Sequence, residues 1–306
     1  MTQRIPTITR RVHFFRLAHA EEYLPLLPDC LRVIDGLPWV GQGRYQPDMS
    51  DDSLLSVLPH SFDYPLKIEF GRTRRDNLPA IERGGVKKTL SIAEDAGLID
   101  VCHIVIFSDG FVAAEFNRDA PRLRKLGEYL LFKGKNLPHT PRFQRLFERD
   151  VAELIEQMAD VRFLEIEIPV DNVSLVKRAD SNLYAALQAQ TKVNSSKTVG
   201  VYFNSRNPED GILKRIAINL MDLIKRSDQD RDFEKLKIKG KDSTTGKSKF
   251  LDLLEDYLIA DVEFKKPSYK ARSIDSAAAF EAIELAYLQR KEAIANAARG
   301  TGLWKD

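Results

Sequence analysis

The sequence has few of the residues that mark a disulfide-stabilised or membrane-embedded protein. Only 2 of its 306 residues are cysteine, and one distant pair, Cys30 and Cys102, suits reduced, buried thiols better than a disulfide framework. No apolar run approaches the roughly 18 residues that a membrane span needs. The segment from Met1 to Arg11 also lacks the apolar centre of a secretory signal. We therefore expect a cytoplasmic globular protein with no direct membrane insertion.

Catalytic and metal-binding motifs are equally scarce. No GxSxG element or Cys/His constellation marks a covalent nucleophile, and Gly240 lies one residue too far from Gly246-Lys247-Ser248 for a phosphate-binding loop. His103 lies in an apolar strand, where we expect a core histidine. Metal-ligand spacing is absent from the five histidines, which are His13, His19, His60, His103 and His139. We expect no catalytic residue, no metal site and no cofactor.

The pattern of apolar residues predicts an α+β fold with mixed or antiparallel sheets. Val101 to Phe107 and Phe111 to Phe116 predict a hairpin, and a helix should follow Pro121 and end at a left-handed cap on Gly134. The last segment, Ser273 to Arg299, predicts a long C-terminal amphipathic helix. The length suggests two α+β domains, which we place at residues 1–170 and 171–306.

The net charge of +2 hides a strong segregation of charge along the chain. Acidic residues dominate from Glu21 to Asp63 and from Glu148 to Asp171. Basic residues gather in four other segments, which are Arg72 to Lys88, Arg118 to Arg149, Arg231 to Lys249 and Lys265 to Arg272. Such segregation produces strong local potentials, unless the basic and acidic segments simply pair with each other in the fold.

The most distinctive pattern is a run of alternating lysines, Lys235, Lys237, Lys239 and Lys241. In a strand, alternate side chains share one face at a spacing of about 6.6–7 Å, while Leu236 and Ile238 would face a core. Such a row can contact the DNA phosphate backbone without reading bases. A simpler interpretation is a solvated strand whose lysines discourage aggregation.

Further basic residues extend the candidate DNA-binding set beyond this row. Arg122 and Lys125 share one helical face. The other members are Arg72, Arg74, Arg75, Lys247, Lys249, Lys265 and Lys266. Because few aromatic residues are interleaved with these bases, we expect contacts with duplex backbone rather than stacking on single strands. No recognition helix or zinc-finger spacing is visible, which argues against sequence-specific binding.

Two alternatives to non-catalytic DNA binding stay open. Glu263-Phe264-Lys265 contains an acid-x-Lys element of the kind that holds Mg²⁺ in many nucleases, and Asp252 or Asp256 could complete it. A charged alternating strand also produces this pattern by chance. The other alternative is an interaction protein whose basic faces bind an acidic protein.

Several segments resemble the RexA family of phage exclusion proteins. From Ile104 to Lys135, an apolar strand and the turn Ser108-Asp109-Gly110 precede a helix with Tyr129-Leu130 and Lys133-Gly134-Lys135. The similarity continues in the C-terminal segments Leu236 to Lys241, Asp242 to Gly246, Glu255-Asp256-Tyr257-Leu258, Ala286-Tyr287 and Arg290.

The resemblance covers about half of the chain and few of the first hundred residues. It implies a two-domain homodimer related in fold to the recombination-associated protein RdgC. It also implies sequence-independent binding of double-stranded DNA, a role in prophage-encoded antiviral defence, and a membrane or effector protein encoded nearby as a further partner. No individual functional residue is carried over from that family.

Overall fold

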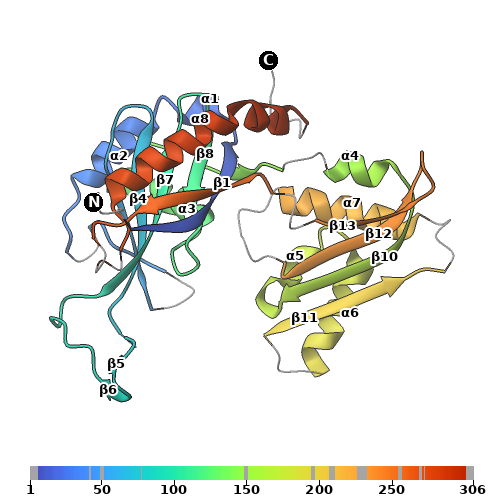
Figure 1. Cartoon of the computed structure of the whole chain (residues 1–306), viewed down its shortest axis with the longest axis horizontal. Helices are drawn as coiled ribbons and strands as arrows, with labels where there is room; N and C mark the ends of the chain where they lie inside the picture. Colours follow the sequence, from blue (N-terminus) through green and yellow to red (C-terminus); the bar gives the residue numbers. More distant parts are fainter. Residues whose placement is uncertain are drawn as a thin grey trace, which may run out of the picture. The chain divides into compact units, whose positions relative to one another are not determined.

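Figure 1 shows a computed structural model of the chain, which confirms the predicted α+β class and the long C-terminal helix. The structure describes residues 6–40, 43–48, 52–76, 78–147, 151–193, 197–206, 211–225, 233–253, 257–268, 271 and 273–300. Glu255, Asp256 and Arg272, which entered the predictions above, lie outside these ranges. None of the helices in the described part of the chain is both long and apolar enough to cross a membrane.

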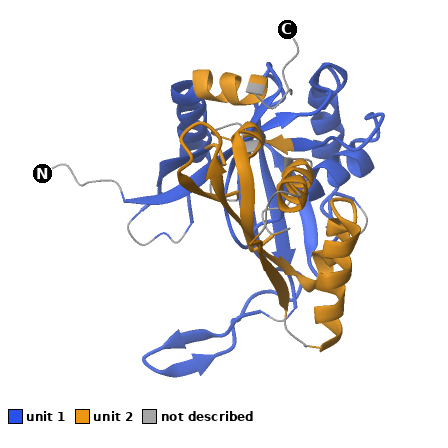
Figure 2. Ribbon diagram, turned by 90° about the vertical axis from the view of Figure 1, so that its right-hand side faces the viewer, with its two compact units in different colours: residues 1–143, 259–290 blue, residues 144–258, 291–306 orange. Residues whose placement is uncertain are grey.

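The chain forms two compact units, coloured separately in Figure 2. Unit 1 contains residues 1–143 and 259–290, and unit 2 contains residues 144–258 and 291–306. The expected division at residue 170 is therefore corrected. Residues before Pro169 form the central strand of the unit 2 sheet, so this proline ends a strand rather than a domain. A contiguous division also could not anticipate that the chain returns to unit 1 at Ile259.

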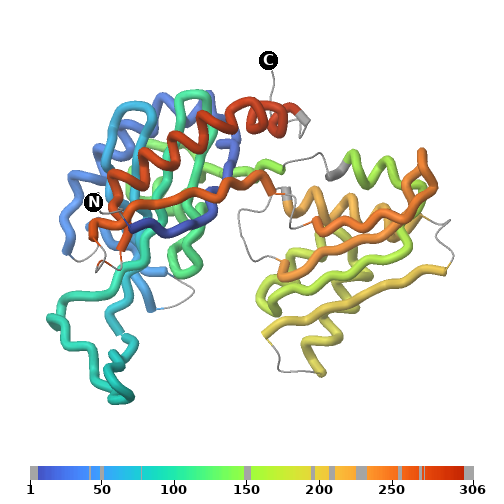
Figure 3. Tube along the Cα trace, in the orientation of Figure 1, coloured from blue at the N-terminus to red at the C-terminus, as the bar shows by residue number. Residues whose placement is uncertain are grey.

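Unit 1 is built on an eight-stranded sheet in the order β14-β1-β8-β7-β4-β3-β2, with β9 also paired to β1. The returning strand β14 (Ile259–Lys265) pairs antiparallel with β1 (Thr7–Leu17), as the colours of Figure 3 make visible. The other strands are β2 (Gln46–Pro47), β3 (Leu54–Pro59), β4 (Leu66–Arg74), β7 (Leu98–Ile106), β8 (Phe111–Glu115) and β9 (Phe143–Arg145). A separate exposed hairpin contains β5 (Ile81–Arg83) and β6 (Val86–Lys88).

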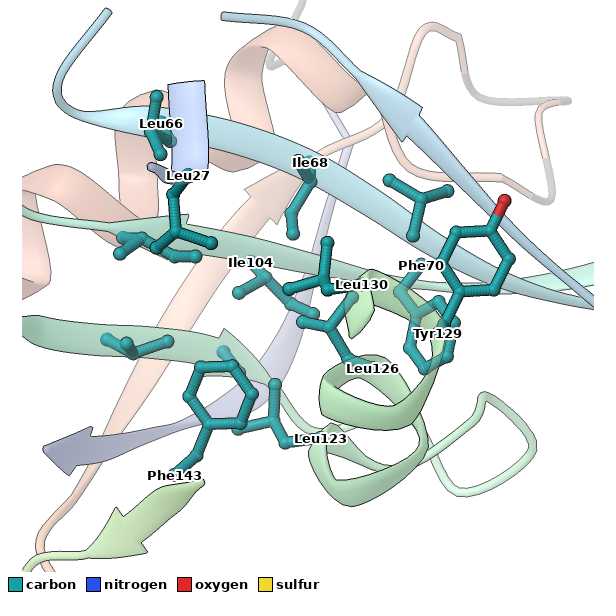
Figure 4. Packing of buried hydrophobic residues seen from close by; sticks show 14 of the residues in the cluster. Leu27, Leu66, Ile68, Phe70, Ile104, Leu123, Leu126, Tyr129, Leu130 and Phe143 are labelled. Carbon is teal, nitrogen blue, oxygen red and sulfur yellow. The ribbon is translucent and has the colours of Figure 1, made fainter. Parts of the chain in front are cut away.

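Helices cover both faces of this sheet. The helices of unit 1 are α1 (Ala20–Tyr23), α2 (Leu27–Asp35), α3 (Leu123–Gly134) and most of α8 (Ser276–Gly300). Figure 4 shows how α2 and α3 bury Leu27, Leu126 and Leu130 against Ile68 and Ile104. Removing such apolar surface from water is the main stabilising contribution. Helix α8 packs on the opposite face, where Tyr287 stacks on Phe107 with ring centroids 3.6 Å apart.

The end of α3 differs from its prediction in one respect. Gly134 belongs to the last turn of the helix, and the left-handed residue is Lys135, with a φ of 61°. A Cβ atom at position 134 would lie 2.1 Å from the Cys30 Sγ atom. The glycine therefore permits close packing of α3 on α2 rather than a left-handed cap. Cys30 and Cys102 are free and buried, as predicted, and burial raises the pKa of Cys30 to about 12.

Unit 2 contains an antiparallel four-stranded sheet in the order β11-β10-β12-β13. Its strands are β10 (Met158–Pro169), β11 (Thr198–Asn204), β12 (Lys235–Asp242) and β13 (Ser248–Asp252). Its helical segments are α4 (Val151–Glu156), η1 (Val170–Asn172), α5 (Val173–Val176), α6 (Ser181–Val193) and α7 (Ile212–Lys225). Leu187 of α6 and Leu220 of α7 share a core with Leu164 and Ile238 on one face of the sheet. The opposite face carries the side chains described next.

Candidate nucleic-acid interface

Strand β12 presents its lysines on the outer face of the unit 2 sheet, away from the core. Leu236 and Ile238 are 0% exposed, whereas the lysines between and beyond them are exposed or half-buried. The predicted extended conformation and the predicted alternation of faces are both confirmed. The alternation arises because successive side chains in a strand point to opposite sides of the sheet.

The lysines in the first half of this row form ion pairs with carboxylates of the neighbouring strands. Lys235 Nζ lies 2.8 Å from Glu167 Oε2 and 3.7 Å from Glu165 Oε1, both on β10. The hydrogen bond and the charge of Glu167 raise the pKa of Lys235. Lys237 Nζ lies 3.1 Å from Asp252 Oδ2 on β13. The expectation of four equivalent phosphate-binding lysines is therefore corrected for Lys235 and Lys237, whose charges are largely neutralised within the sheet.

The second half of the row borders an open hollow of about 570 Å³. Lys239 and Lys241 are exposed, and neither forms an ion pair within the described residues. The hollow reaches across all four strands, and its lining consists of Arg162, Phe163, Asn204, Lys239, Gly240, Lys241, Ser248 and Phe250. We call this set the open end of the sheet face. It combines three cationic side chains, two aromatic rings and two hydrogen-bonding groups.

A β-bulge in β10 brings Arg162 to the open end. Val161 pairs with Gly240 and Phe163 pairs with Lys239, so Arg162 is the extra residue on its strand. A bulge re-aims a side chain, and here Arg162 and its neighbour Phe163 both line the hollow. A Cβ atom on Gly240 would lie 2.0 Å from the Asp160 carbonyl oxygen. Glycine is thus the residue that lets β12 approach the bulge.

The carboxylate of Asp160 contacts the groups around this bulge. The Arg162 Nε and Nη2 atoms donate to Asp160 Oδ2 at 2.9 and 2.8 Å, and the Lys241 backbone N–H donates to Asp160 Oδ1 at 3.1 Å. The hydrogen bond from Arg162 is the largest cause of a lowered Asp160 pKa. The carboxylate therefore stays ionised and orients the guanidinium beside the hollow. With Lys239 and Lys241 added, the open end keeps an excess of positive charge.

Lys247 and Lys249 are the two remaining unit 2 lysines of the predicted DNA-binding set, and they lie in and after the connection between β12 and β13. Lys247 is exposed in the connection. Ser248 and Phe250 line the hollow, so the half-buried Lys249 between them points to the other side of β13. The prediction that Lys249 belongs to the same phosphate-binding surface is therefore wrong. The strands on both sides of Gly246-Lys247-Ser248 are antiparallel neighbours, which is not the strand–loop–helix arrangement of a phosphate-binding loop.

The basic residues predicted in unit 1 contribute mainly to its own packing. Arg74 Nη2 lies 3.0 Å from Asp100 Oδ2, and the Arg75 guanidinium lies over the Tyr45 ring at 5.0 Å. Arg72 is half-buried on β4.

The two basic residues predicted at α3, Arg122 and Lys125, also form contacts within unit 1. Arg122 donates to the carbonyl oxygens of Asn117 and Arg118 and lies over the Phe116 ring, and Lys125 forms an ion pair with the buried Asp48. Lys265 and Lys266 lie at the end of β14, where Lys265 pairs with Thr7. These seven residues belong to unit 1 and do not join the open end within unit 2.

The proposed nuclease residues do not assemble a metal site in the described part of the chain. No group of three or more His, Cys, Asp or Glu side chains gathers there in a way that could hold a metal ion. Glu263 is exposed on β14 of unit 1, while Asp252 lies on β13 of unit 2 and pairs with Lys237. His103 is a buried core histidine, as expected, with Nδ1 2.5 Å from Glu115 Oε2.

No family model matches this chain, and no curated protein matches it significantly.

Proposed function

We propose that this protein is a non-catalytic DNA-binding protein. It binds the phosphate backbone of DNA, including double-stranded DNA, at the open end of the unit 2 sheet. The observation that carries the proposal is the position of Lys239 and Lys241. Both ammonium groups border a hollow that crosses four strands, and neither forms a close ion pair among the described residues. The Asp160 carboxylate, which also interacts with the charge of Lys241, is bound by Arg162. The other half of the lysine row, by contrast, is internally neutralised.

The side chains of the open end suit the binding of a polyanion such as DNA without preference for its sequence. Each ammonium that neutralises a phosphate releases condensed counterions, which supplies the affinity of sequence-independent DNA binding. Asn204 and Ser248 add neutral hydrogen-bonding groups at the two edges of the hollow, and such groups commonly contact phosphate and sugar oxygens. The antiparallel face presents strands rather than a helix for insertion into the major groove, so base-specific reading is not part of the proposal.

The biological setting is part of the same proposal and derives from the resemblance to the RexA family. In that setting the protein acts in the cytoplasm as a homodimer, in a prophage-encoded defence against other phages, with an effector or membrane protein encoded nearby. Two copies on one DNA molecule would strengthen binding through effective concentration.

Fluorescence anisotropy of a labelled 20-base-pair duplex of random sequence tests the DNA-binding proposal. The double variant Lys239→Gln/Lys241→Gln removes the two unpaired charges and should weaken binding at least ten-fold. The matched control is Lys192→Gln/Lys197→Gln, which removes two exposed lysines elsewhere in unit 2 and should change affinity less than two-fold. Equal losses in the two variants, or no binding by the wild-type protein at moderate salt, would contradict the proposal.

A further inference from the structure

The open end contains two aromatic rings in a single cross-strand row. Phe163 of β10 and Phe250 of β13 both pair with Lys239 of β12, one from each side. Phe250 is 55% exposed, although it lies on the polar face of the sheet. The Lys237 ammonium lies 5.9 Å from the centre of its ring. Both rings line the hollow.

A half-buried ring and an exposed ring beside cationic side chains match what unpaired bases require. A base can stack on an aromatic ring whatever its identity, while neighbouring cations hold the phosphates. In a duplex, each base already stacks on its neighbours, so its flat faces are not available to a protein ring. A surface built only for duplex backbone gains nothing from exposed phenylalanine, because the ring offers neither charge nor a hydrogen bond.

The spacing of the row also fits a strand laid across the sheet. Phe163 and Phe250 are separated by two strand spacings, or about 9.5 Å, and Lys239 lies between them. A segment crossing the strands can place one base on each ring and the connecting phosphates over Lys239. Asn204 and Ser248, at the edges of the hollow, can then contact the sugar-phosphate chain on either side.

We propose that the open end binds DNA segments with unpaired bases, which stack on Phe163 and Phe250. This inference rests on the proposed DNA binding and specifies its preferred ligand. The DNA forms it favours are single strands, gaps and bubbles rather than continuous duplex. The thin interleaving of aromatics along the sequence predicted the opposite, because Phe163 and Phe250 become neighbours of the lysines only through strand pairing.

The test compares a labelled 20-nucleotide oligo(dT) with a 20-base-pair duplex under identical salt. The wild-type protein should bind the single strand about ten-fold more tightly. Phe250→Ala should weaken single-strand binding about ten-fold and change duplex binding less than two-fold, whereas Phe250→Tyr should retain single-strand binding. Phe163→Ala should act in the same direction. The control is Phe132→Ala, which removes another exposed ring and should change neither affinity.

The outcomes separate the inference from the DNA-binding proposal on which it rests. If the wild-type protein binds neither ligand, DNA binding itself fails. If it binds both with equal affinity, or if Phe250→Ala lowers both affinities alike in a protein with an unchanged melting temperature, DNA binding stands and base stacking is overturned.

Discussion

The Lys237 ammonium lies 3.1 Å from the Asp252 carboxylate on the adjacent strand. This contact is the boundary between the ion-paired lysines of the row and those without a close ion pair. Towards Lys235, carboxylates of β10 face the lysines. Towards Lys241, the neighbours are Phe163, Phe250 and Ser248, together with Asp160, whose carboxylate is bound by Arg162. One strand thus contributes both a neutralised half and a cationic half to the same face.

Releasing Lys235 from its partners should enlarge the cationic surface. The variant Glu165→Gln/Glu167→Gln removes the carboxylates that neutralise Lys235 while keeping similar side-chain volumes. We expect DNA binding to tighten several-fold, and the slope of log affinity against log salt to steepen by about one for each phosphate gained.

The control for this variant is Glu281→Gln/Glu292→Gln, which removes two exposed carboxylates from α8. It changes net charge by the same amount and should tighten binding less. Equal tightening in both variants would attribute the effect to net charge and would contradict the assignment of the site to this face.

Gly240 should be essential for the bulge that positions Arg162. Gly240→Ala places a methyl group 2.0 Å from the Asp160 carbonyl oxygen, and the backbone must shift to relieve it. Overpacking of this kind costs about 1–3 kcal/mol, which urea denaturation measures. Gly36→Ala is a suitable control, because the nearest atom to its added Cβ is 3.6 Å away. A Gly240→Ala protein as stable as the wild type would show that the bulge tolerates a side chain.

The charge network around Glu115 predicts a specific pH dependence of stability in unit 1. Burial favours a higher pKa for Glu115, but the hydrogen bond and charge of His103, followed by the charge of Arg10, outweigh it and lower the pKa below the ordinary 4.5. A lowered carboxyl pKa stabilises the folded state above the ordinary value, and this stability is lost as pH falls through the folded pKa. Glu115→Gln should therefore destabilise the protein at neutral pH by about 3 kcal/mol, because it leaves the buried His103 without its carboxylate partner.

The measurement for Glu115 is denaturant unfolding of the wild type and Glu115→Gln from pH 7 to pH 3. The difference in unfolding free energy should shrink as the pH falls below about 5, where the carboxyl group becomes protonated in the unfolded state. A difference that persists unchanged at pH 3 would mean that volume or packing, rather than charge, dominates the effect of the substitution.

How far the sequence predicts this site can be judged on β12 and its neighbours. The alternation of Lys235 to Lys241 with Leu236 and Ile238 correctly predicts a strand with one cationic face, because the period of two is a local property. The neutralisation of Lys235 and Lys237 depends on the register of β10 and β13. Strand register between distant segments is not encoded in local periodicity, so Glu165, Glu167 and Asp252 could not be assigned as partners.

Phe163 and Phe250 were missed for the same reason, since pairing rather than sequence proximity brings them to Lys239. One local signal was available. Gly240 interrupts the lysine strand, and a glycine within a strand often marks a bulge or a close backbone approach. The domain division was also beyond local patterns, because unit 1 is completed by residues after Ile259.

The absence of nuclease activity is a further expectation. Supercoiled plasmid incubated with the protein and Mg²⁺ should stay intact, since Asp252 is already ion-paired with Lys237. Nicking that is abolished by Glu263→Gln would instead support the metal-dependent alternative.

The most direct measurement is the salt dependence of DNA affinity in the wild type and in Lys239→Gln/Lys241→Gln. If these two ammonium groups contact phosphates, the slope of log affinity against log salt should be shallower by about two in the variant on duplex DNA. A wild-type affinity that barely changes with salt, or the same slope in both proteins, would contradict phosphate binding by Lys239 and Lys241.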